Sequence, residues 1–153
     1  MQIFGTAAGA SEKLNKAISR ESRIDGTDRT SGLHPERIDG GIEFENVAFA
    51  YPSRPDSIVV KELSMSIPAF KHTAIVGQSG SGKSTVAALM ARLYDPNEGS
   101  VKLDGVELRE LNVAHLRGCI GAVQQDPALL DRSILENIAH GLINSNADRK
   151  SVV

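Results

Sequence analysis

The spacing of apolar residues along the chain changes several times, and each change marks the start of a predicted element. Between residues 7 and 20 apolar side chains recur at helical spacing with polar residues between them, which predicts one amphipathic helix. Residues 21–41 are rich in Asp, Ser, Thr, Gly and Arg and show no periodicity. We interpret this second segment as a linker.

From Ile42 the pattern becomes one of short apolar segments bounded by turn residues, which is typical of β-strands. Three such segments span residues 42–51, 58–67 and 73–76, and a fourth spans 120–123. Cys119 precedes this fourth strand, and we interpret it as a small apolar residue rather than a reactive thiol.

Helical spacing returns after Ser84. The apolar residues on one face are Val86, Leu89, Met90 and Leu93, and the run 96–99, with its Pro and Gly, is expected to end this helix. We interpret this apolar face, and that of residues 134–138, as core.

Turn and cap residues organise the remaining chain. Asp104 and Gly105 between two short apolar segments predict a two-residue β-hairpin, and this turn explains Asp104 better than a metal site does. Asn112 is expected to cap a short helix that ends at Gly118.

A further helix is predicted to start after Ser133. Ser133 and Glu136 have the spacing of a capping box, and Gly141 is expected to end this helix. The order of elements is that of a mixed α/β protein.

Composition narrows the class of protein. The chain has 153 residues, of which 41% are hydrophobic and 24% charged, enough to bury a core. Seventeen Lys and Arg against nineteen Asp and Glu give a net charge of -2 without a basic cluster, so we expect no nucleic-acid partner. The single Cys excludes an internal disulfide, and the four His show no metal-ligand spacing. We expect neither a signal peptide nor an apolar stretch near the roughly 20 residues that cross a bilayer.

The most specific motif is G-x-x-x-x-G-K-[S/T], which follows the predicted strand 73–76 and precedes the helix after Ser84. Its residues are Gly77, Gln78, Ser79, Gly80, Ser81, Gly82, Lys83, Ser84 and Thr85. Backbone N–H groups of such a loop and the N-terminus of the following helix bind polyphosphates. Lys83 is expected to contact the β- and γ-phosphates, a contact worth about 4 kcal/mol at an effective dielectric near 20, and Ser84 to ligate Mg²⁺. A chance match in a surface turn is the alternative, which the strand and helix around the motif disfavour.

Several motifs together resemble the nucleotide-binding domain of ABC transporters. Besides the phosphate loop they lie in residues 42–55, 93–99, 103–105, 111–112, 116–117, 123–127 and 134–138. The chain is most similar to multidrug-resistance (P-glycoprotein-like) exporters, and the double Gln before Asp126 is similar to fungal members.

The resemblance implies a fold and a division of the chain. The fold is an α/β P-loop NTPase (RecA-like) core with an antiparallel β subdomain, incomplete at the C-terminus. Residues 1–40 are then a helix and linker following a transmembrane domain, 41–144 the N-terminal part of the ATP-binding domain, and 145–153 a divergent tail.

The resemblance also implies roles for residues outside the loop. Tyr51 resembles the aromatic residue that stacks on adenine, which agrees with the ability of a flat ring to stack on a base; the alternative is a tyrosine that only ends a half-buried strand. Gln125 resembles the glutamine that approaches Mg²⁺ and the attacking water, while Gln124 is a rival by sequence and an ordinary loop glutamine is the alternative. Arg54 either lies near the nucleotide or is a solvated loop residue.

The expected cofactors are ATP and Mg²⁺, and the expected partners are transmembrane domains and a facing nucleotide-binding domain on the cytoplasmic face of a membrane. The sequence contains no L-S-G-G-Q signature and no Walker B run ending in Asp and Glu. We therefore expect a fragment that binds MgATP and hydrolyses it poorly. One alternative is a non-catalytic nucleotide-binding pseudo-domain without transport activity. Another is a soluble ABC-type ATPase of repair or translation, which residues 51–55 fit poorly.

Overall fold

The structure is a computed structural model that describes residues 12, 14–16, 18–19, 22–123 and 129–142. Contacts divide the chain into two units, Met1–Ile120 and Gly121–Val153, which are described separately. Within the first predicted helix, the described residues Glu12, 14–16 and Ile18 are helical.

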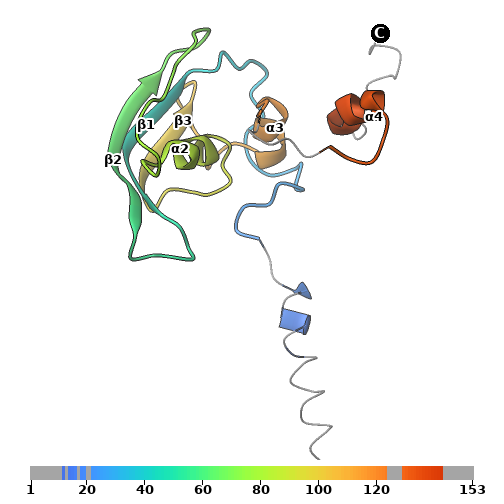
Figure 1. The fold of residues 1–153 in the computed structure, drawn as a ribbon, viewed down its shortest axis with the longest axis horizontal. Helices are drawn as coiled ribbons and strands as arrows, with labels where there is room; N and C mark the ends of the chain where they lie inside the picture. The colour runs from blue at the N-terminus through green and yellow to red at the C-terminus, as the bar shows by residue number, and fades with distance from the viewer. Residues whose placement is uncertain (1–11, 13, 17, 20–21, 124–128, 143–153) are drawn as a thin grey trace, which may run out of the picture. The chain divides into compact units, whose positions relative to one another are not determined.

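A four-stranded antiparallel sheet forms the centre of the first unit (Figure 1). Its strands lie in the order β2 (Ile58–Ile67), β1 (Ile42–Ala50), β3 (Glu98–Leu103) and β4 (Val106–Glu107). Both long strands that the sequence predicts are confirmed, β1 being one residue shorter than expected. The hairpin between β3 and β4 is also confirmed, with φ of 50° at Asp104 and 83° at Gly105, as a type I′ turn requires.

A bulge in β1 brings its apolar residues to the core. Strict alternation from Phe44 would put Asn46 inside and Val47 outside, yet Val47 is buried, as are Phe44 and Phe49, while Asn46 is exposed. Asn46 has a φ of 49°, and the pairing of β1 with both neighbours shifts at this point. One extra residue therefore reverses the alternation, as β-bulges do. Gly99 lies against this bulge.

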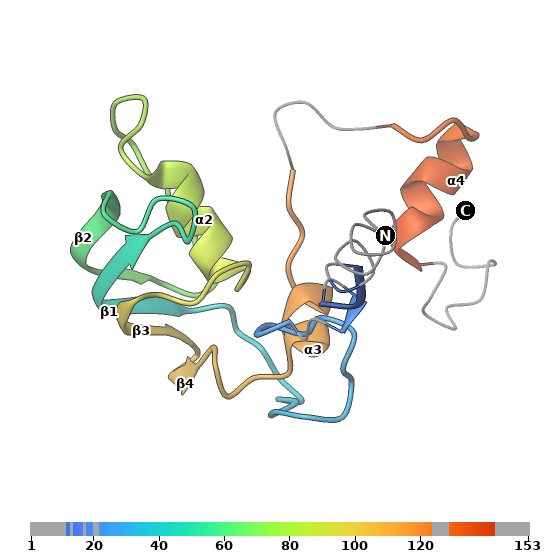
Figure 2. The same cartoon turned by 90° about the horizontal axis from the view of Figure 1, so that it is seen from below.

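Helix α2 (Lys83–Met90) packs on one face of the sheet (Figures 1 and 2). Val86 and Leu89 are 6% and 1% exposed and contact the apolar residues of the strands, so the predicted core face of this helix is confirmed for these two residues. The rest of the core is contributed by β1, β2, β3 and the segment after β4: Phe44, Val47, Phe49, Val60, Val101, Leu103, Leu108, Leu111 and Leu116.

Helix α2 ends at Met90, earlier than predicted. Arg92 has a φ of 46° and reverses the chain, while the N–H of Leu93 donates to the Ala88 carbonyl at 2.9 Å, which is the hydrogen bond of a Schellman motif. The guanidinium of Arg92 donates to Asp95 at 3.1 Å and to the Leu111 carbonyl at 3.0 Å, contacts that offset the strain of a positive φ. Leu93 consequently lies outside the helix and is 54% exposed, so its predicted place on the core face is wrong.

Two further predictions made from the sequence are wrong. Residues 73–76 and 120–123 are not strands. A strand requires a hydrogen-bonded neighbour, and neither segment has one among the described residues; Val76 and Val123 are fully or almost fully exposed, whereas parallel strands are buried. Cys119, which we interpret from the sequence as a small apolar residue before a buried strand, is exposed.

Helix α3 (Val113–Gly118) confirms the predicted cap and also binds the linker. Asn112 is 2% exposed, and its side-chain oxygen accepts from the N–H of His115 at 2.8 Å. Its amide nitrogen donates to the carbonyls of Asp28 and Ser31 at 2.9 and 2.6 Å. The segment 28–35 therefore lies against the start of α3, where Leu33 also forms a parallel bridge with Leu111.

Asp104 fixes the end of the linker just before β1. Its carboxylate accepts from the backbone N–H groups of Asp39, Gly40 and Gly41, at 2.8, 3.1 and 2.7 Å. Burial raises the pKa of this carboxyl, but the three N–H donors outweigh that effect and hold the pKa below its usual value of 3.8. The hairpin turn thus carries a carboxylate that sets where the linker enters the sheet.

The second unit contains α4 (Ile134–Ile138) and the 3₁₀ helix η1 (Ala139–Leu142). The predicted capping box is confirmed: the Ser133 hydroxyl accepts from the N–H of Glu136 at 3.3 Å, and the N–H of Ser133 donates to the Glu136 carboxylate at 3.0 Å. The helix ends at Ile138 and tightens into a 3₁₀ turn that includes Gly141. None of its residues is buried, so the prediction that 134–138 belongs to the core is wrong.

Candidate functional site

The phosphate loop enters helix α2 at a glycine that no other residue replaces easily. Gly82 is the N-cap of α2, with φ of 88° and ψ of 6°, a left-handed conformation that only glycine adopts at low cost. The position where a Cβ would lie is 3.3 Å from the Val59 carbonyl of β2. The start of the helix is therefore held close to the sheet, while Figure 2 shows the loop before it extending away from the strands.

The N-terminus of α2 is arranged to accept an anion. The first N–H groups of any helix have no partner within the helix, and they give its N-terminus a partial positive charge. Here the N-cap is glycine, so no side chain caps these groups, and the first turn contains no acidic residue. Gly82 accepts the first helical hydrogen bond from Val86 at 2.9 Å, which places the N–H groups of residues 83–85 at the free end.

Lys83 lies across the loop. Its ammonium group donates to the carbonyls of Gly77 and Gln78 at 2.9 and 2.6 Å and to the Ser81 hydroxyl at 3.3 Å. These contacts hold a positive charge directly beside the N-terminus of α2. Ser84, the second residue of the helix, is exposed, as are residues 77–81. The loop therefore presents backbone amides, an ammonium group and a hydroxyl to solvent together.

Three aromatic rings gather where β1 ends. The centroid of the Tyr51 ring lies 5.0 Å from that of Phe49 and 5.3 Å from that of Tyr94, at interplanar angles of 78° and 88°. Phe49 and Tyr94 are 5.5 Å apart. We call Phe49, Tyr51 and Tyr94 the aromatic group. The N–H of Ala50 donates to the side-chain oxygen of Asn97 at 2.7 Å, which fixes the backbone just before Tyr51.

A hydrogen bond joins the aromatic group to the phosphate loop. The hydroxyls of Tyr51 and Thr85 are 2.9 Å apart, and Thr85, the third residue of α2, is 4% exposed. The structure thus brings together two parts of the predicted site that lie 34 residues apart in sequence.

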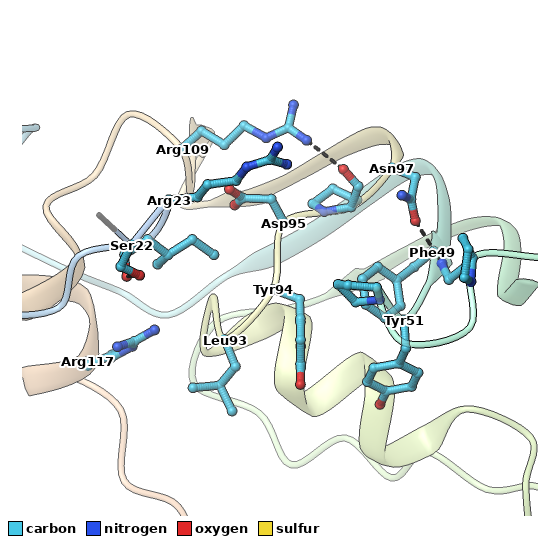
Figure 3. Close-up of a pocket in the computed structure, with 15 residues that line it drawn as sticks. Ser22, Arg23, Phe49, Tyr51, Leu93, Tyr94, Asp95, Asn97, Arg109 and Arg117 are labelled. Atoms are coloured by element: carbon cyan, nitrogen blue, oxygen red, sulfur yellow. Dashed lines mark hydrogen bonds between the residues drawn. The ribbon is translucent and has the colours of Figure 1, made fainter. Parts of the chain in front are cut away.

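A pocket of about 1210 Å³ lies beside the aromatic group. Figure 3 shows the aromatic group on one side of this pocket and Arg23, Arg109 and Asp95 on the other. Arg109 donates to the Pro96 carbonyl at 2.7 Å. None of residues 77–85 lines the pocket, which shares the aromatic group, Ala50 and Asn97 with the candidate site.

The other predicted site residues lie apart from this arrangement or outside what the structure describes. Gln125 and its rival Gln124 lie outside the described residues. Arg54 is exposed in a turn, where its N–H donates to the Tyr51 carbonyl at 2.8 Å.

Sequence reasoning did not identify Phe49, Tyr94 and Asn97 as supports of Tyr51, nor the hydroxyl contact of Thr85. Tyr94 and Asn97 lie in the motif 93–99, which is the signal that could have found them. Among the helices that the structure describes, none combines the length and hydropathy needed to cross a membrane.

Comparison with known proteins gives a consistent result. Residues 60–152 match the family described as ABC transporter. The chain is 54% identical over 153 residues to the ABC multidrug transporter MDR2 of Trichophyton tonsurans, an alignment that covers 97% of this chain and 11% of the relative. It is 52% identical over 147 residues to the ABC multidrug transporter mdr4 of Aspergillus fumigatus, covering 94% of this chain and 11% of that protein. The identity to the ABC multidrug transporter atrC of Emericella nidulans is 46% over 150 residues, covering 96% of this chain and 12% of that protein.

These relatives confirm the resemblance predicted from the sequence motifs, including its fungal character. The chain spans about a ninth of the length of the curated relatives that it matches, 11% for the first of them.

Proposed function

The chain belongs to the ABC transporter family, and from this premise we propose that it binds MgATP as part of the nucleotide-binding domain of a multidrug exporter. The observation that carries the proposal is the uncapped N-terminus of α2 with the Lys83 ammonium beside it. A triphosphate placed there receives backbone N–H donors, the helix dipole and one full positive charge. The exchange of loop carbonyls for phosphate oxygens around Lys83 gives the ammonium stronger, charged partners.

Tyr51 is the proposed adenine contact. Its ring lies at the end of β1, and its hydroxyl is within hydrogen-bonding distance of the first turn of α2, so a nucleotide bound at the loop has an aromatic ring close to it. Stacking of a base on an aromatic side chain is worth about 1–3 kcal/mol. The two edge-on neighbours of Tyr51 support this ring in one orientation.

Ser84 is the proposed Mg²⁺ ligand, since its hydroxyl follows Lys83 at the exposed start of α2 and Mg²⁺ prefers oxygen ligands. We propose Gln125 as a second residue directed to the metal, on the family resemblance alone. Bound Mg²⁺ supplies charge neutralisation between the phosphates.

Transport is proposed for the whole protein rather than for these residues. The relatives are named multidrug transporters, and by analogy we propose transmembrane domains and a facing nucleotide-binding domain as the partners. In that assembly the residues described here contribute nucleotide binding on the cytoplasmic side of the membrane.

A titration of the 153-residue chain with MgATP, in which calorimetry measures the heat of binding, tests the proposal. We expect saturable binding that Lys83→Ala weakens at least about a hundredfold, because the loop loses its only side-chain charge. Lys61→Ala is the matched control: it removes the same charge from an exposed position on β2, and ATP affinity should stay within about twofold of wild type. Absence of binding by the folded wild-type chain, or equal loss in both variants, contradicts the proposal.

A further inference from the structure

We propose that Thr85 is a positioning residue, whose buried hydroxyl holds the Tyr51 ring so that the helix that binds the phosphates also sets the position of the base-binding ring. This inference rests on the proposed function and adds to it a specific link between two parts of the site. It assigns to Thr85 a role beyond its place in the phosphate-loop motif.

The first step is the environment of the Thr85 hydroxyl. Thr85 and Asn112 are the buried polar residues in the part of the chain that the structure describes. A buried hydroxyl requires a partner, and threonine within a helix commonly finds one at the carbonyl of the preceding turn. Here the partner is the hydroxyl of Tyr51, a residue that directly follows β1 and lies 34 residues earlier in the sequence.

The second step is the rigidity of the Thr85 side chain and backbone. Thr85 is β-branched, so its χ1 angle is restricted in a helix, and its backbone is fixed because the N-cap Gly82 packs on β2 while Val86 is buried beside it. The Thr85 oxygen is therefore a fixed point relative to the N–H groups that face the phosphates.

The third step concerns the contacts that restrain the Tyr51 ring. Phe49 and Tyr94 contact Tyr51 at interplanar angles of 78° and 88°, so both support the ring edge-on and neither supplies a hydrogen bond to its hydroxyl. The Thr85 hydroxyl supplies that bond and completes the restraint. Stacking on a base requires the ring to lie in one plane, and a ring held in place before binding loses less entropy when the base arrives.

Comparison of two ligands separates this role from a general effect on the loop. MgATP uses both the phosphate loop and the ring, whereas magnesium tripolyphosphate uses only the loop. We expect Thr85→Val, which keeps the shape but removes the hydroxyl, to weaken ATP binding about three- to tenfold and to change tripolyphosphate binding less than about twofold. Tyr51→Phe should have the same pattern, and the double variant should lose no more than either single one.

Two further variants of the 153-residue chain complete the experiment. Thr85→Ser keeps the hydroxyl and should restore most of the ATP affinity. Thr73→Val makes the same chemical change at an exposed position and should alter neither affinity. If Thr85→Val does not fold, as judged by circular dichroism, the selectivity of Tyr51→Phe for ATP over tripolyphosphate still tests the hydroxyl pair.

The outcomes separate this inference from the proposed function. Equal weakening of ATP and tripolyphosphate by Thr85→Val, additive losses in the double variant, or no loss in Tyr51→Phe overturns the inference while leaving nucleotide binding intact. Failure of the wild-type chain to bind either ligand refutes the proposed function instead.

Discussion

At the scale of single residues, several positions are determined by contacts that only the fold creates. Asn46 and Gly99 form one such pair, because the bulge in β1 leaves the carbonyls of residues 45 and 46 directed at the backbone of β3. The sequence predicts β1 from its apolar content, but a bulge requires knowledge of both neighbouring strands. The same holds for Thr85, whose type and motif are visible in the sequence while its partner is not.

Gly99→Ala is predicted to destabilise the protein strongly. A Cβ at this position would lie 2.3 Å from the Glu45 carbonyl oxygen and 2.4 Å from that of Asn46, and these backbone atoms cannot move away without breaking the sheet. The φ of 76° adds further strain. We expect a loss of about 2–4 kcal/mol in the free energy of unfolding, measured by urea denaturation.

Gly105→Ala is the matched control for this variant. Gly105 has a φ of 83°, but no described atom beyond its two neighbours in the chain lies within 4 Å of the position of an added Cβ. The Gly105→Ala variant should therefore lose only the contribution of backbone strain, about 1 kcal/mol in the free energy of unfolding. Equal losses in the two variants would show that the contact with the bulge is unimportant.

At the scale of elements, sequence patterns that depend on adjacent residues predicted the structure correctly. Patterns that require a partner strand elsewhere in the chain predicted it less reliably. The Asp104–Gly105 turn, the Asn112 cap and the Ser133–Glu136 capping box each depend on nearby residues, and all are confirmed. The strands predicted at 42–51 and 58–67 are also confirmed, the first as far as Ala50, and each has the other as its paired neighbour. The segments 73–76 and 120–123 have the composition of buried strands, yet they have no strand partner in the described structure. The β-propensity of a residue reflects how well its side chain packs on a half-buried sheet. Composition alone therefore does not show whether segments 73–76 and 120–123 have a strand to pair with.

The attachment of the linker to the sheet is predicted to depend on pH. The pKa of Asp104 is below 3.8 in the folded protein, so its contribution to stability is fully present above the pKa of the unfolded chain and is lost as the pH falls through the folded value. Asp104→Asn keeps a residue that tolerates positive φ but removes the titrating carboxylate. Above pH 5 we expect this variant to be less stable than wild type by less than about 1 kcal/mol, because the group is largely exposed.

Urea denaturation of both proteins between pH 7 and pH 2.5 measures this dependence. The difference in the free energy of unfolding should begin to shrink near pH 3.8, where the carboxyl of the unfolded chain becomes protonated, and should be lost as the pH falls through the lower pKa of the folded protein. A difference that stays constant over the whole range would show that the three N–H contacts do not stabilise the charged form.

At the scale of the whole molecule, stability is expected to be distributed unevenly. The buried core is contributed by the sheet, by α2 and by the segment from Leu108 to Leu116, all in the first unit. Helix α4 in the second unit has a good capping box but only five residues, and Ile134, Leu135 and Ile138 are 81%, 58% and 66% exposed. So short a helix without packing is marginal in water. Capping patterns in the sequence thus predicted where this helix starts, but not whether it is packed.

Hydrogen exchange on the intact chain, read by mass spectrometry, tests this distribution together with the site. Amides of β1 and β3 should exchange at least about a hundredfold more slowly than those of 134–138, because local opening of α4 exposes no buried surface. Addition of MgATP should slow exchange mainly in residues 77–86, where the N–H groups of the loop and of the start of α2 would bind phosphate, and Lys83→Ala should abolish this change. Protection of α4 equal to that of β1 would contradict the predicted stability difference, and nucleotide-induced protection spread evenly over the chain would argue against binding at the loop.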